Sequence, residues 1–222
     1  MIVGELITSP AHIVMSAADE FVNKTRRVNE MWQTDFTYFK IIRWGWYYLS
    51  TILDDYSRFI IACDLHTQMT SKDVIPSVEK ALKFTGLTKD NAPKILSDNA
   101  KCYLSGEILG SLAGKGIKPI NGKPFHPQTH GKIERYHRTM KNVIKLDNYY
   151  SPEDLIKAIA EFVKYYKYER YHESLRNLTP ADVYFGRDKK ILKERSKIKE
   201  KTLQERRKNY IVRKLELDYE NI

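Results

Sequence analysis

Residues 32–66 contain three consecutive runs of β-type sequence, and only a few polar residues separate them. The runs are "WQTDFTYFKI", "GWYYLSTILDD" and "RFIIACDLH", with breaks at residues 43–45 and 54–57. Aromatic and β-branched residues favour strands, and such short breaks favour antiparallel pairing of neighbouring strands. These residues are therefore predicted to form an antiparallel meander of three strands.

Helical and β-type segments alternate after the third run. Apolar residues recur at three- and four-residue spacing over residues 72–86, which predicts a helix with Ser71 as its N-cap and Gly86 as its end. A short buried strand, a Gly-interrupted helix and a last short strand are then predicted over residues 94–98, 105–116 and 117–120. Three strands followed by helix, strand, helix and strand indicate an α/β fold with a mixed five-stranded sheet.

Two further helices are predicted to flank this sheet. The segment "NGKPFHPQTHG" at residues 121–131 carries two Pro and two Gly and is predicted to be a loop. Residues 132–146 then have the apolar spacing of a helix with one buried stripe, and the next helix is predicted to begin at Pro152 with Ser151 as its cap. The stripe consists of Ile133, Tyr136, Met140, Val143 and Ile144.

The positive charge of the chain is concentrated near its C-terminal end. The net charge is +10, and residues 187–214 hold thirteen Lys or Arg against four Asp or Glu, a net charge of +9. A nearly neutral body with a basic helical tail is typical of a protein that uses an electrostatic arm to bind phosphates, with Arg206, Arg207 and Lys208 as candidate DNA contacts. A solvated helix that only keeps the protein soluble is the alternative.

Composition also excludes several classes of protein. The longest apolar runs, such as "FIIAC", are too short to cross a bilayer, so no membrane partner is expected. The first residues lack the charged and apolar regions of a signal peptide. With only two cysteines, Cys63 and Cys102, the chain has no disulfide framework or Cys-rich zinc site, and a reducing cytoplasm is the expected location.

Three carboxylates stand where a negative charge needs an explanation. Asp35 lies in the middle of an aromatic strand, Asp98 ends the strand at 94–98, and Glu134 follows Asp98 with 35 residues between them, in the first turns of a helix. If the two strands are neighbours and the helix packs across their ends, the three acids converge. Two carboxylates about 4 Å apart repel by roughly 4 kcal/mol at an effective dielectric near 20, and a divalent cation removes that repulsion. Oxygen ligands predict Mg²⁺, with Mn²⁺ as a substitute, and phosphodiester chemistry.

Five segments in order resemble the catalytic core of bacterial insertion-sequence transposases, which share the retroviral-integrase fold and its Asp, Asp, 35 residues, Glu signature. They are "WQTDFTYF", "LDDYSRFI", "LSDNA", "HPQTHGKIERYHRTMK" and "YYKYERYHESLRNLTP". The likeness runs from about residue 30 to residue 186. It implies a ribonuclease-H-like sheet and a polynucleotidyl transferase that nicks DNA at element ends and transfers the strand to target DNA.

The resemblance also implies roles for individual residues. Asp35, Asp98 and Glu134 match the positions of the metal-binding triad. The positions of the candidate DNA contacts are Asn99 beside Asp98, His126 and Gln128 in the predicted loop, and Lys132, Arg138 and Lys141 on the following helix. Two alternatives stay open: an i, i+4 ion pair between Glu134 and Arg138 with a solvated Lys141, and a bracing role for His126 within its loop.

Other noticeable residues are interpreted as structural. Asp54 and Asp55 are the rival acidic pair, but Asp commonly caps the turn that follows a strand. Trp32, Trp44 and Trp46 are interpreted as core and sheet-face residues.

The resemblance does not determine how the complete protein–DNA assembly is organised. It divides the chain into an N-terminal extension or linker (1–29), an integrase-type core (30–186) and a basic tail (187–222). Twenty-nine residues are too few for a helix-turn-helix that recognises element ends and a linker, so either a separate polypeptide supplies it or the chain is a truncated element or an isolated core. A homo-oligomer on DNA is expected. The alternatives are a catalytically inactive, DNA-binding remnant that regulates an intact transposase, and a cellular nuclease of the same fold.

Overall fold

The computed structural model describes residues 24–98, 100–121 and 131–220, without the side chains of Asn121 and of residues 215–220. The described residues fall into two compact units that divide after Ala158. Most of the predicted loop at 121–131 lies outside the described residues.

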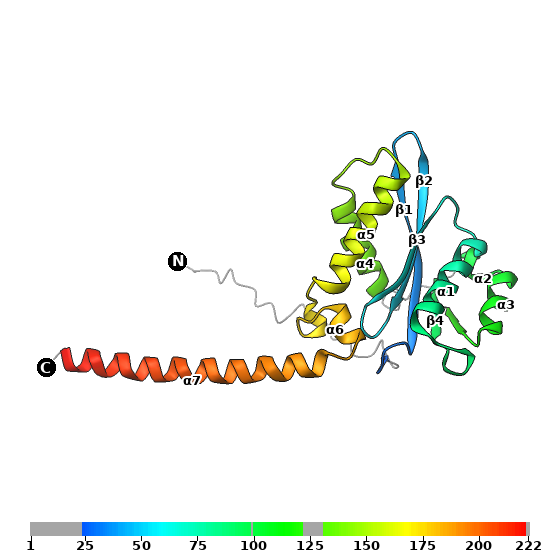
Figure 1. Ribbon diagram of the computed structural model, residues 1–222. Helices are drawn as coiled ribbons and strands as arrows, with labels where there is room; N and C mark the ends of the chain where they lie inside the picture. The colour runs from blue at the N-terminus through cyan, green and yellow to red at the C-terminus, as the bar shows by residue number, and fades with distance from the viewer. Residues whose placement is uncertain (1–23, 99, 122–130, 221–222) are drawn as a thin grey trace, which may run out of the picture. The chain divides into compact units, whose positions relative to one another are not determined.

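A five-stranded mixed sheet forms the centre of the first unit (Figure 1). The strands are β1 (Met31–Ile41), β2 (Gly45–Asp54), β3 (Ile60–His66), β4 (Lys94–Ser97) and β5 (Lys118–Asn121), in the spatial order β3-β2-β1-β4-β5. The pairs β1–β2 and β2–β3 are antiparallel, whereas β1–β4 and β4–β5 are parallel. This arrangement confirms the predicted meander and the mixed sheet.

Strand β1 is much longer than its parallel neighbour. It pairs with β2 from Trp32 opposite Asp54 to Ile41 opposite Gly45, but its ladder with β4 covers only the first three residues, ending at Gln33 opposite Leu96. The β1–β2 hairpin therefore continues beyond the parallel half of the sheet. Its turn brings Arg43 to a positive φ of 69°.

Helices cover both faces of the sheet (Figure 1). On one face lie α1 (Ser71–Thr85), α2 (Lys101–Leu104) and α3 (Gly106–Gly114), and on the other lies α4 (Gly131–Ile144). The Tyr103 hydroxyl of α2 lies 3.3 Å from Thr34 Oγ1, while the Ile133 N–H of α4 donates to Gln33 Oε1 at 3.0 Å. Because neighbouring strand residues point to opposite faces, these contacts place α2 and α4 on opposite sides of β1.

The predicted helices are confirmed, with corrections at individual residues. The N-cap of α1 is Thr70 and not Ser71, because Thr70 forms the capping box with Asp73, whose Oδ2 accepts from the Thr70 N–H and Oγ1. Gly86 ends the helix in the left-handed conformation as predicted. On α4 the predicted stripe is buried except for Val143, which is exposed. The one-turn helix α2 has no counterpart among the predicted elements.

The second unit contains the rest of α5 (Pro152–Tyr168), then α6 (Pro180–Tyr184) and the long α7 (Asp188–Glu220). Two short 3₁₀ turns complete the chain, η3 (Lys89–Asn91) in the first unit and η5 (Glu173–Leu175) in the second. The cap of α5 is confirmed, since Ser151 Oγ accepts from the Asp154 N–H.

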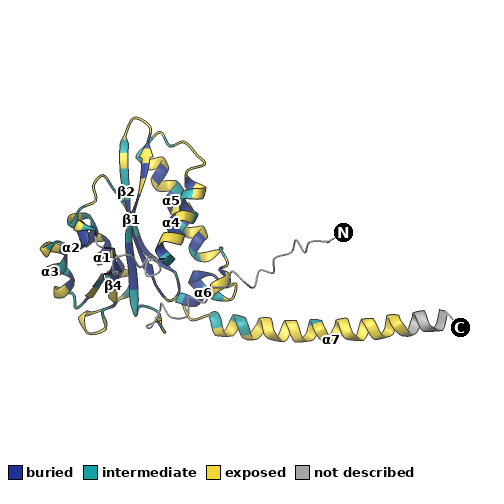
Figure 2. Cartoon of the chain, turned by 180° about the vertical axis from the view of Figure 1, so that it is seen from behind, coloured by how far each residue is buried: buried dark blue, intermediate teal, exposed yellow. Residues whose placement is uncertain are grey.

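Helix α7 confirms the predicted helical tail, and most of its described side chains are exposed (Figure 2). None of the described helices combines the length and the apolar character that a membrane crossing requires.

Candidate active site

Asp35 is held in its strand by a histidine from α4. Its Oδ1 accepts a hydrogen bond from the Phe36 N–H at 2.8 Å, and its Oδ2 lies 3.3 Å from His137 Nδ1. The other ring nitrogen, His137 Nε2, lies 3.3 Å from Oγ1 of Thr51, the residue paired with Asp35 on β2. The buried imidazole thus ties the carboxylate to both β2 and α4, which explains how an aromatic strand carries an acid.

Asp98 directly follows the last residue of β4, whereas Asp35 lies within β1, the parallel neighbour of β4. Gln33 pairs with Leu96 at the end of the parallel ladder, and each acid lies two residues further along its chain. Burial raises the pKa of the Cys102 thiol, and the negative charges of Asp98 and Asp35 raise it further, so both carboxylates lie near the same side chain. The structure therefore places Asp35 on β1 and Asp98 just after the end of the neighbouring strand β4.

Glu134 faces the same region from the first turns of α4. An open hollow of about 660 Å³ lies between β1 and α4, and Asp35 and Glu134 both line it. His137, Arg138 and Lys141 line it as well. The hollow thus joins two of the three predicted acids to two of the predicted DNA contacts.

The three acids do not form a closed metal-binding group. Within the described ranges, no three His, Cys, Asp or Glu side chains are arranged so that they could hold a metal ion. Asp35 contacts His137 instead, and Asp98 Oδ1 accepts from the Ala100 N–H at 3.1 Å. Hard carboxylate oxygens at this edge of the sheet still have the donor chemistry that Mg²⁺ prefers. The assignment of Asp35, Asp98 and Glu134 as metal ligands stays a prediction.

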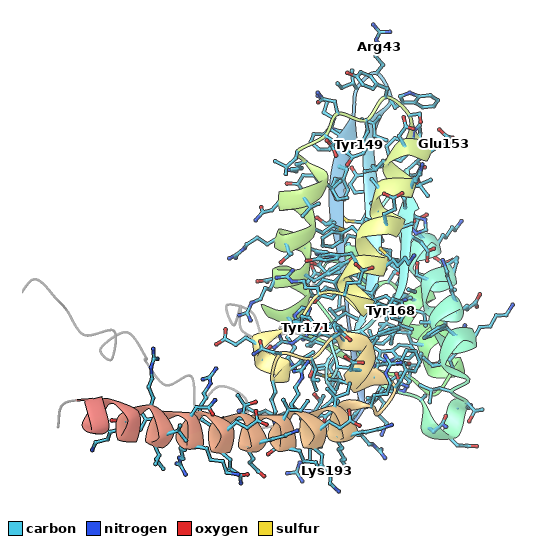
Figure 3. The ribbon with its side chains drawn as sticks, turned by 60° about the vertical axis from the view of Figure 1, so that its left-hand side comes forward. Arg43, Tyr149, Glu153, Tyr168, Tyr171 and Lys193 are labelled. Atoms are coloured by element: carbon cyan, nitrogen blue, oxygen red, sulfur yellow. The ribbon has the colours of Figure 1, made fainter. Side chains whose placement is uncertain are left out.

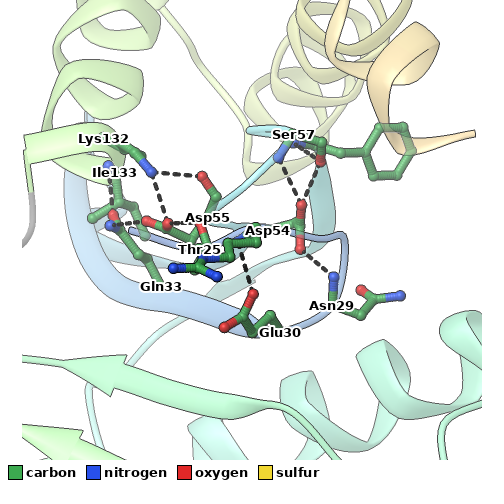
Figure 4. Close-up of polar contacts among 11 residues, drawn as sticks. Thr25, Asn29, Glu30, Gln33, Asp54, Asp55, Ser57, Lys132 and Ile133 are labelled. Atoms are coloured by element: carbon green, nitrogen blue, oxygen red, sulfur yellow. Dashed lines mark hydrogen bonds and ion pairs between the residues drawn. The ribbon is translucent and has the colours of Figure 1, made fainter. Parts of the chain in front are cut away.

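A buried polar network fixes the first turn of α4 to the sheet (Figure 4). Lys132 Nζ donates to Asp55 Oδ2 at 2.7 Å and to the Asp55 carbonyl oxygen at 2.8 Å. Gln33 donates from Nε2 to Asp55 Oδ1 at 2.8 Å and accepts the Ile133 N–H. Since Glu134 follows Ile133 directly, this network, called the α4 anchor below, sets the position of Glu134 relative to β1.

The neighbouring carboxylate caps the turn after β2, as the sequence predicts. Asp54 accepts hydrogen bonds from the Asn29 N–H at 2.7 Å and from the Ser57 N–H and Oγ at 2.8 and 2.6 Å (Figure 4). Burial raises the pKa of Asp54 above its usual value, although these hydrogen bonds oppose the shift. The rival pair Asp54 and Asp55 is therefore structural.

The predicted DNA contacts have different surroundings. Arg138 is exposed, and in the part of the chain that the structure describes no ion pair joins it to Glu134. Lys141 Nζ lies 4.5 Å from the centre of the Tyr38 ring, and burial, followed by the charge of Lys145, lowers the pKa of Lys141.

Other predicted contacts lie elsewhere or outside the described residues. Lys132 belongs to the α4 anchor, and Asn99, His126 and Gln128 are not among the described residues. Arg206, Arg207 and Lys208 are exposed on α7.

His137 is the residue of this site that the sequence analysis missed. It lies three residues after Glu134 on the same helix, a spacing that puts two side chains on one face. That spacing, together with the need for a partner for a strand carboxylate, is the signal that points to it.

Two family models with the same description match most of the chain. Both are described as integrase core domain; one matches residues 25–127 and the other residues 115–180. Among curated proteins, the Gag-Pro-Pol polyprotein of mouse mammary tumor virus (strain BR6) is 32% identical over 138 residues, which is 60% of this chain and 7% of the polyprotein. That of Mason-Pfizer monkey virus is 32% identical over 117 residues, which is 53% of this chain and 6% of the polyprotein. The chain thus spans less than a tenth of these relatives.

Solved structures share the fold at lower sequence identity. A simian T-cell lymphotropic virus intasome in complex with the PP2A regulatory subunit B56 gamma matches with a TM-score of 0.63 and 22% identity, over 73% of this chain and 56% of the other. The HTLV-2 integrase catalytic core domain in complex with magnesium, in its dimeric form, matches with a TM-score of 0.56 and 22% identity, over 71% of this chain and 97% of the other. The ribonuclease-H-like fold predicted from the sequence is thereby confirmed.

Proposed function

This chain belongs to the integrase core domain family, and from that premise we propose that it nicks DNA and transfers the cut strand to a second DNA, as the catalytic subunit of an insertion-sequence transposase. One observation carries the proposal: Asp35 lies on β1, Asp98 directly follows the parallel neighbour β4, and Glu134 shares a hollow with Asp35.

Asp35, Asp98 and Glu134 would hold Mg²⁺ through their carboxylate oxygens. Bound there, the metal would neutralise charge at the phosphorus and lower the pKa of an attacking oxygen. The chain's own residues set the geometry for this chemistry. His137 orients Asp35, and the α4 anchor holds the first turn of the helix that carries Glu134. Arg138 and Lys141, which line the hollow, supply positive charge for the DNA phosphates beside the acids.

The full assembly extends beyond this chain. We propose that it works as a homo-oligomer on DNA. The dimeric and trimeric forms of the HTLV-2 integrase core support the oligomer, and the basic tail supports an electrostatic contact with DNA.

The test is a joining assay with the Asp98→Asn variant. The substrate is a duplex that ends in the inverted repeats flanking the coding region, with a plasmid as target and Mg²⁺ in the buffer. Asp98→Asn and Glu134→Gln are expected to fold and to bind DNA while losing joining, because each removes one ligand charge. Asp90→Asn, an exposed carboxylate on η3, is the control and should keep full activity.

The products distinguish the alternatives. Joined products that disappear in Asp98→Asn support a transposase. Hydrolysis of the plasmid without joining supports a nuclease. DNA binding without any cleavage in Mg²⁺ or Mn²⁺ supports the inactive regulatory remnant, and an active Asp98→Asn protein removes the triad assignment.

A further inference from the structure

The far end of the β1–β2 hairpin carries an unusual amount of exposed aromatic surface. The exposed fractions are 51% for Tyr38, 57% for Trp44 and 51% for Trp46. The Tyr38 and Trp46 rings meet edge to face with their centres 5.4 Å apart. Both hairpin tryptophans are predicted from the sequence to be core or sheet-face residues, and their exposure corrects the core interpretation. A concentration of exposed apolar side chains of this kind marks an interaction site.

Positive charges surround these rings. Lys40 Nζ lies 5.7 Å from the centre of the Trp46 ring, and Lys141 Nζ lies 4.5 Å from that of Tyr38. Arg43 extends from the tip of the hairpin (Figure 3). The hairpin segment 36–53 and the helical segment 135–146 contain no Asp or Glu. The two cation contacts on these rings favour a partner that is negatively charged and has flat apolar groups.

The backbone at Arg43 is in the left-handed conformation that tight hairpin turns often require. Its φ of 69° lies in the left-handed region, where a residue with a side chain is about 1–2 kcal/mol less stable and where Gly is ordinary. Stability alone would not favour Arg here. Strained positions that persist are concentrated at functional sites.

The hairpin end is continuous with the candidate active site. Lys141 lines the hollow with Asp35 and also covers Tyr38. From Asp35 to Lys40 the strand advances five residues, or roughly 17 Å. This path is long enough for a few nucleotides of one DNA strand.

We propose that Tyr38, Lys40, Arg43 and Trp46, called the hairpin surface, bind an unpaired DNA strand that leads away from the candidate active site. Bases stack on the Tyr38 and Trp46 rings, and the two cations contact the phosphates. An unpaired strand fits better than a duplex, because a duplex hides the faces of its bases, whereas aromatic rings among cations are the usual platform for single strands. This inference rests on the proposed function, because the proposed DNA cutting at the active site is what would supply the unpaired strand.

Tryptophan fluorescence tests the stacking directly. The chain has three tryptophans, of which Trp32 is fully buried, so variants with a single hairpin tryptophan report on that residue. Trp44 is the matched control, because it is equally exposed on the same hairpin but donates its Nε1–H to the Tyr150 carbonyl oxygen at 3.0 Å. An oligothymidylate of roughly 15 nucleotides, within the site sizes of single-strand-binding folds, is titrated into the full chain in EDTA. Quenching is expected in Trp44→Phe and should be absent from Trp46→Phe.

Affinity measurements show how much each side chain contributes to binding of the single strand. Trp46→Ala should raise the Kd for the oligothymidylate roughly 5- to 100-fold, as expected from the loss of one base–aromatic stack. Trp44→Ala should leave it nearly unchanged. Arg43→Gly separates binding from folding, since it should weaken binding while the Tm stays equal or rises.

Three results would overturn the inference: an unchanged Kd in Trp46→Ala, tighter binding of a blunt duplex than of the single strand, or a Trp46→Ala variant that converts a DNA-free dimer into a monomer. The last would identify the hairpin surface as an interface between copies of the chain. Because EDTA prevents metal-dependent cleavage, binding here is independent of catalysis. Joining without quenching would refute only this inference, and quenching without joining would refute only the proposed function.

Discussion

Lys132→Met is expected to destabilise the protein rather than to weaken its affinity for DNA. The substitution keeps the apolar stem and removes the ammonium, which leaves the buried Asp55 without its cation. Removing one partner of a fully buried ion pair costs about 3–5 kcal/mol. The expected cost here is smaller, about 2 kcal/mol, because 30% of the Lys132 side chain is exposed and Asp55 keeps hydrogen bonds from Gln33 and Thr25. For a chain of this size that corresponds to a fall in Tm of about 4–8 °C.

The assay is thermal unfolding of the full chain, together with a double-mutant cycle. Asp55→Asn is combined with Lys132→Met, and the two changes should be clearly less than additive, since each removes the same contact. Lys145→Met, which removes an exposed lysine just after α4, is the control and should leave the Tm unchanged. The reasoning fails if Lys132→Met has the Tm of the control while its affinity for DNA falls. In that case Lys132 is a DNA contact, as the resemblance implies.

Three further predictions follow from other contacts. His137→Ala should lower Mg²⁺-dependent joining about 10- to 100-fold with folding intact, because the carboxylate of Asp35 loses the side chain that orients it. The variant should need more Mg²⁺ than the wild type for half-maximal joining. Equal Mg²⁺ titration curves would refute the proposal that His137 orients Asp35. Gly116→Ala should lower stability by about 2 kcal/mol or more in urea unfolding, because its φ is +74° and a Cβ would lie 2.5 Å from a main-chain oxygen, whereas Gly110→Ala, in open space, should be neutral or stabilising. Burial raises the pKa of Asp54, so the folded state binds its proton more tightly than the unfolded state does. As the pH falls toward 3.8, the wild type should therefore gain stability relative to Asp54→Asn. Thermal melts in which the stability difference between wild type and Asp54→Asn shrinks over this pH range would contradict the raised pKa.

The parts of the fold that depend on neighbouring residues could be predicted from the sequence. The runs that form β1, β2 and β3 are strongly β-type, and Gly86 and Ser151 mark helix ends by their own chemistry. Thr70 could also have been predicted as the N-cap of α1, because Asp73 lies three residues after it and completes a capping box.

Contacts between distant residues could not be predicted in the same way. The partners in the α4 anchor, Lys132 with Asp55 and Ile133 with Gln33, are 77 and 100 residues apart, and no local pattern selects them. The exposure of Trp44 and Trp46 was missed because aromatic strand residues are usually buried, and nothing local shows that the hairpin extends beyond the parallel half of the sheet.

The α4 anchor also bears on when, during synthesis, the proposed triad can be completed. The first turn of α4 has its place only after the chain has returned to contacts made 100 residues earlier, and Glu134 follows at once. A nascent chain that has left the ribosome only as far as β5 therefore has the sheet and two of the acids but lacks the third. Because distant contacts form late, a chain that has not yet brought Ile133 to Gln33, 100 residues away, is expected to lack the DNA-cutting activity proposed above.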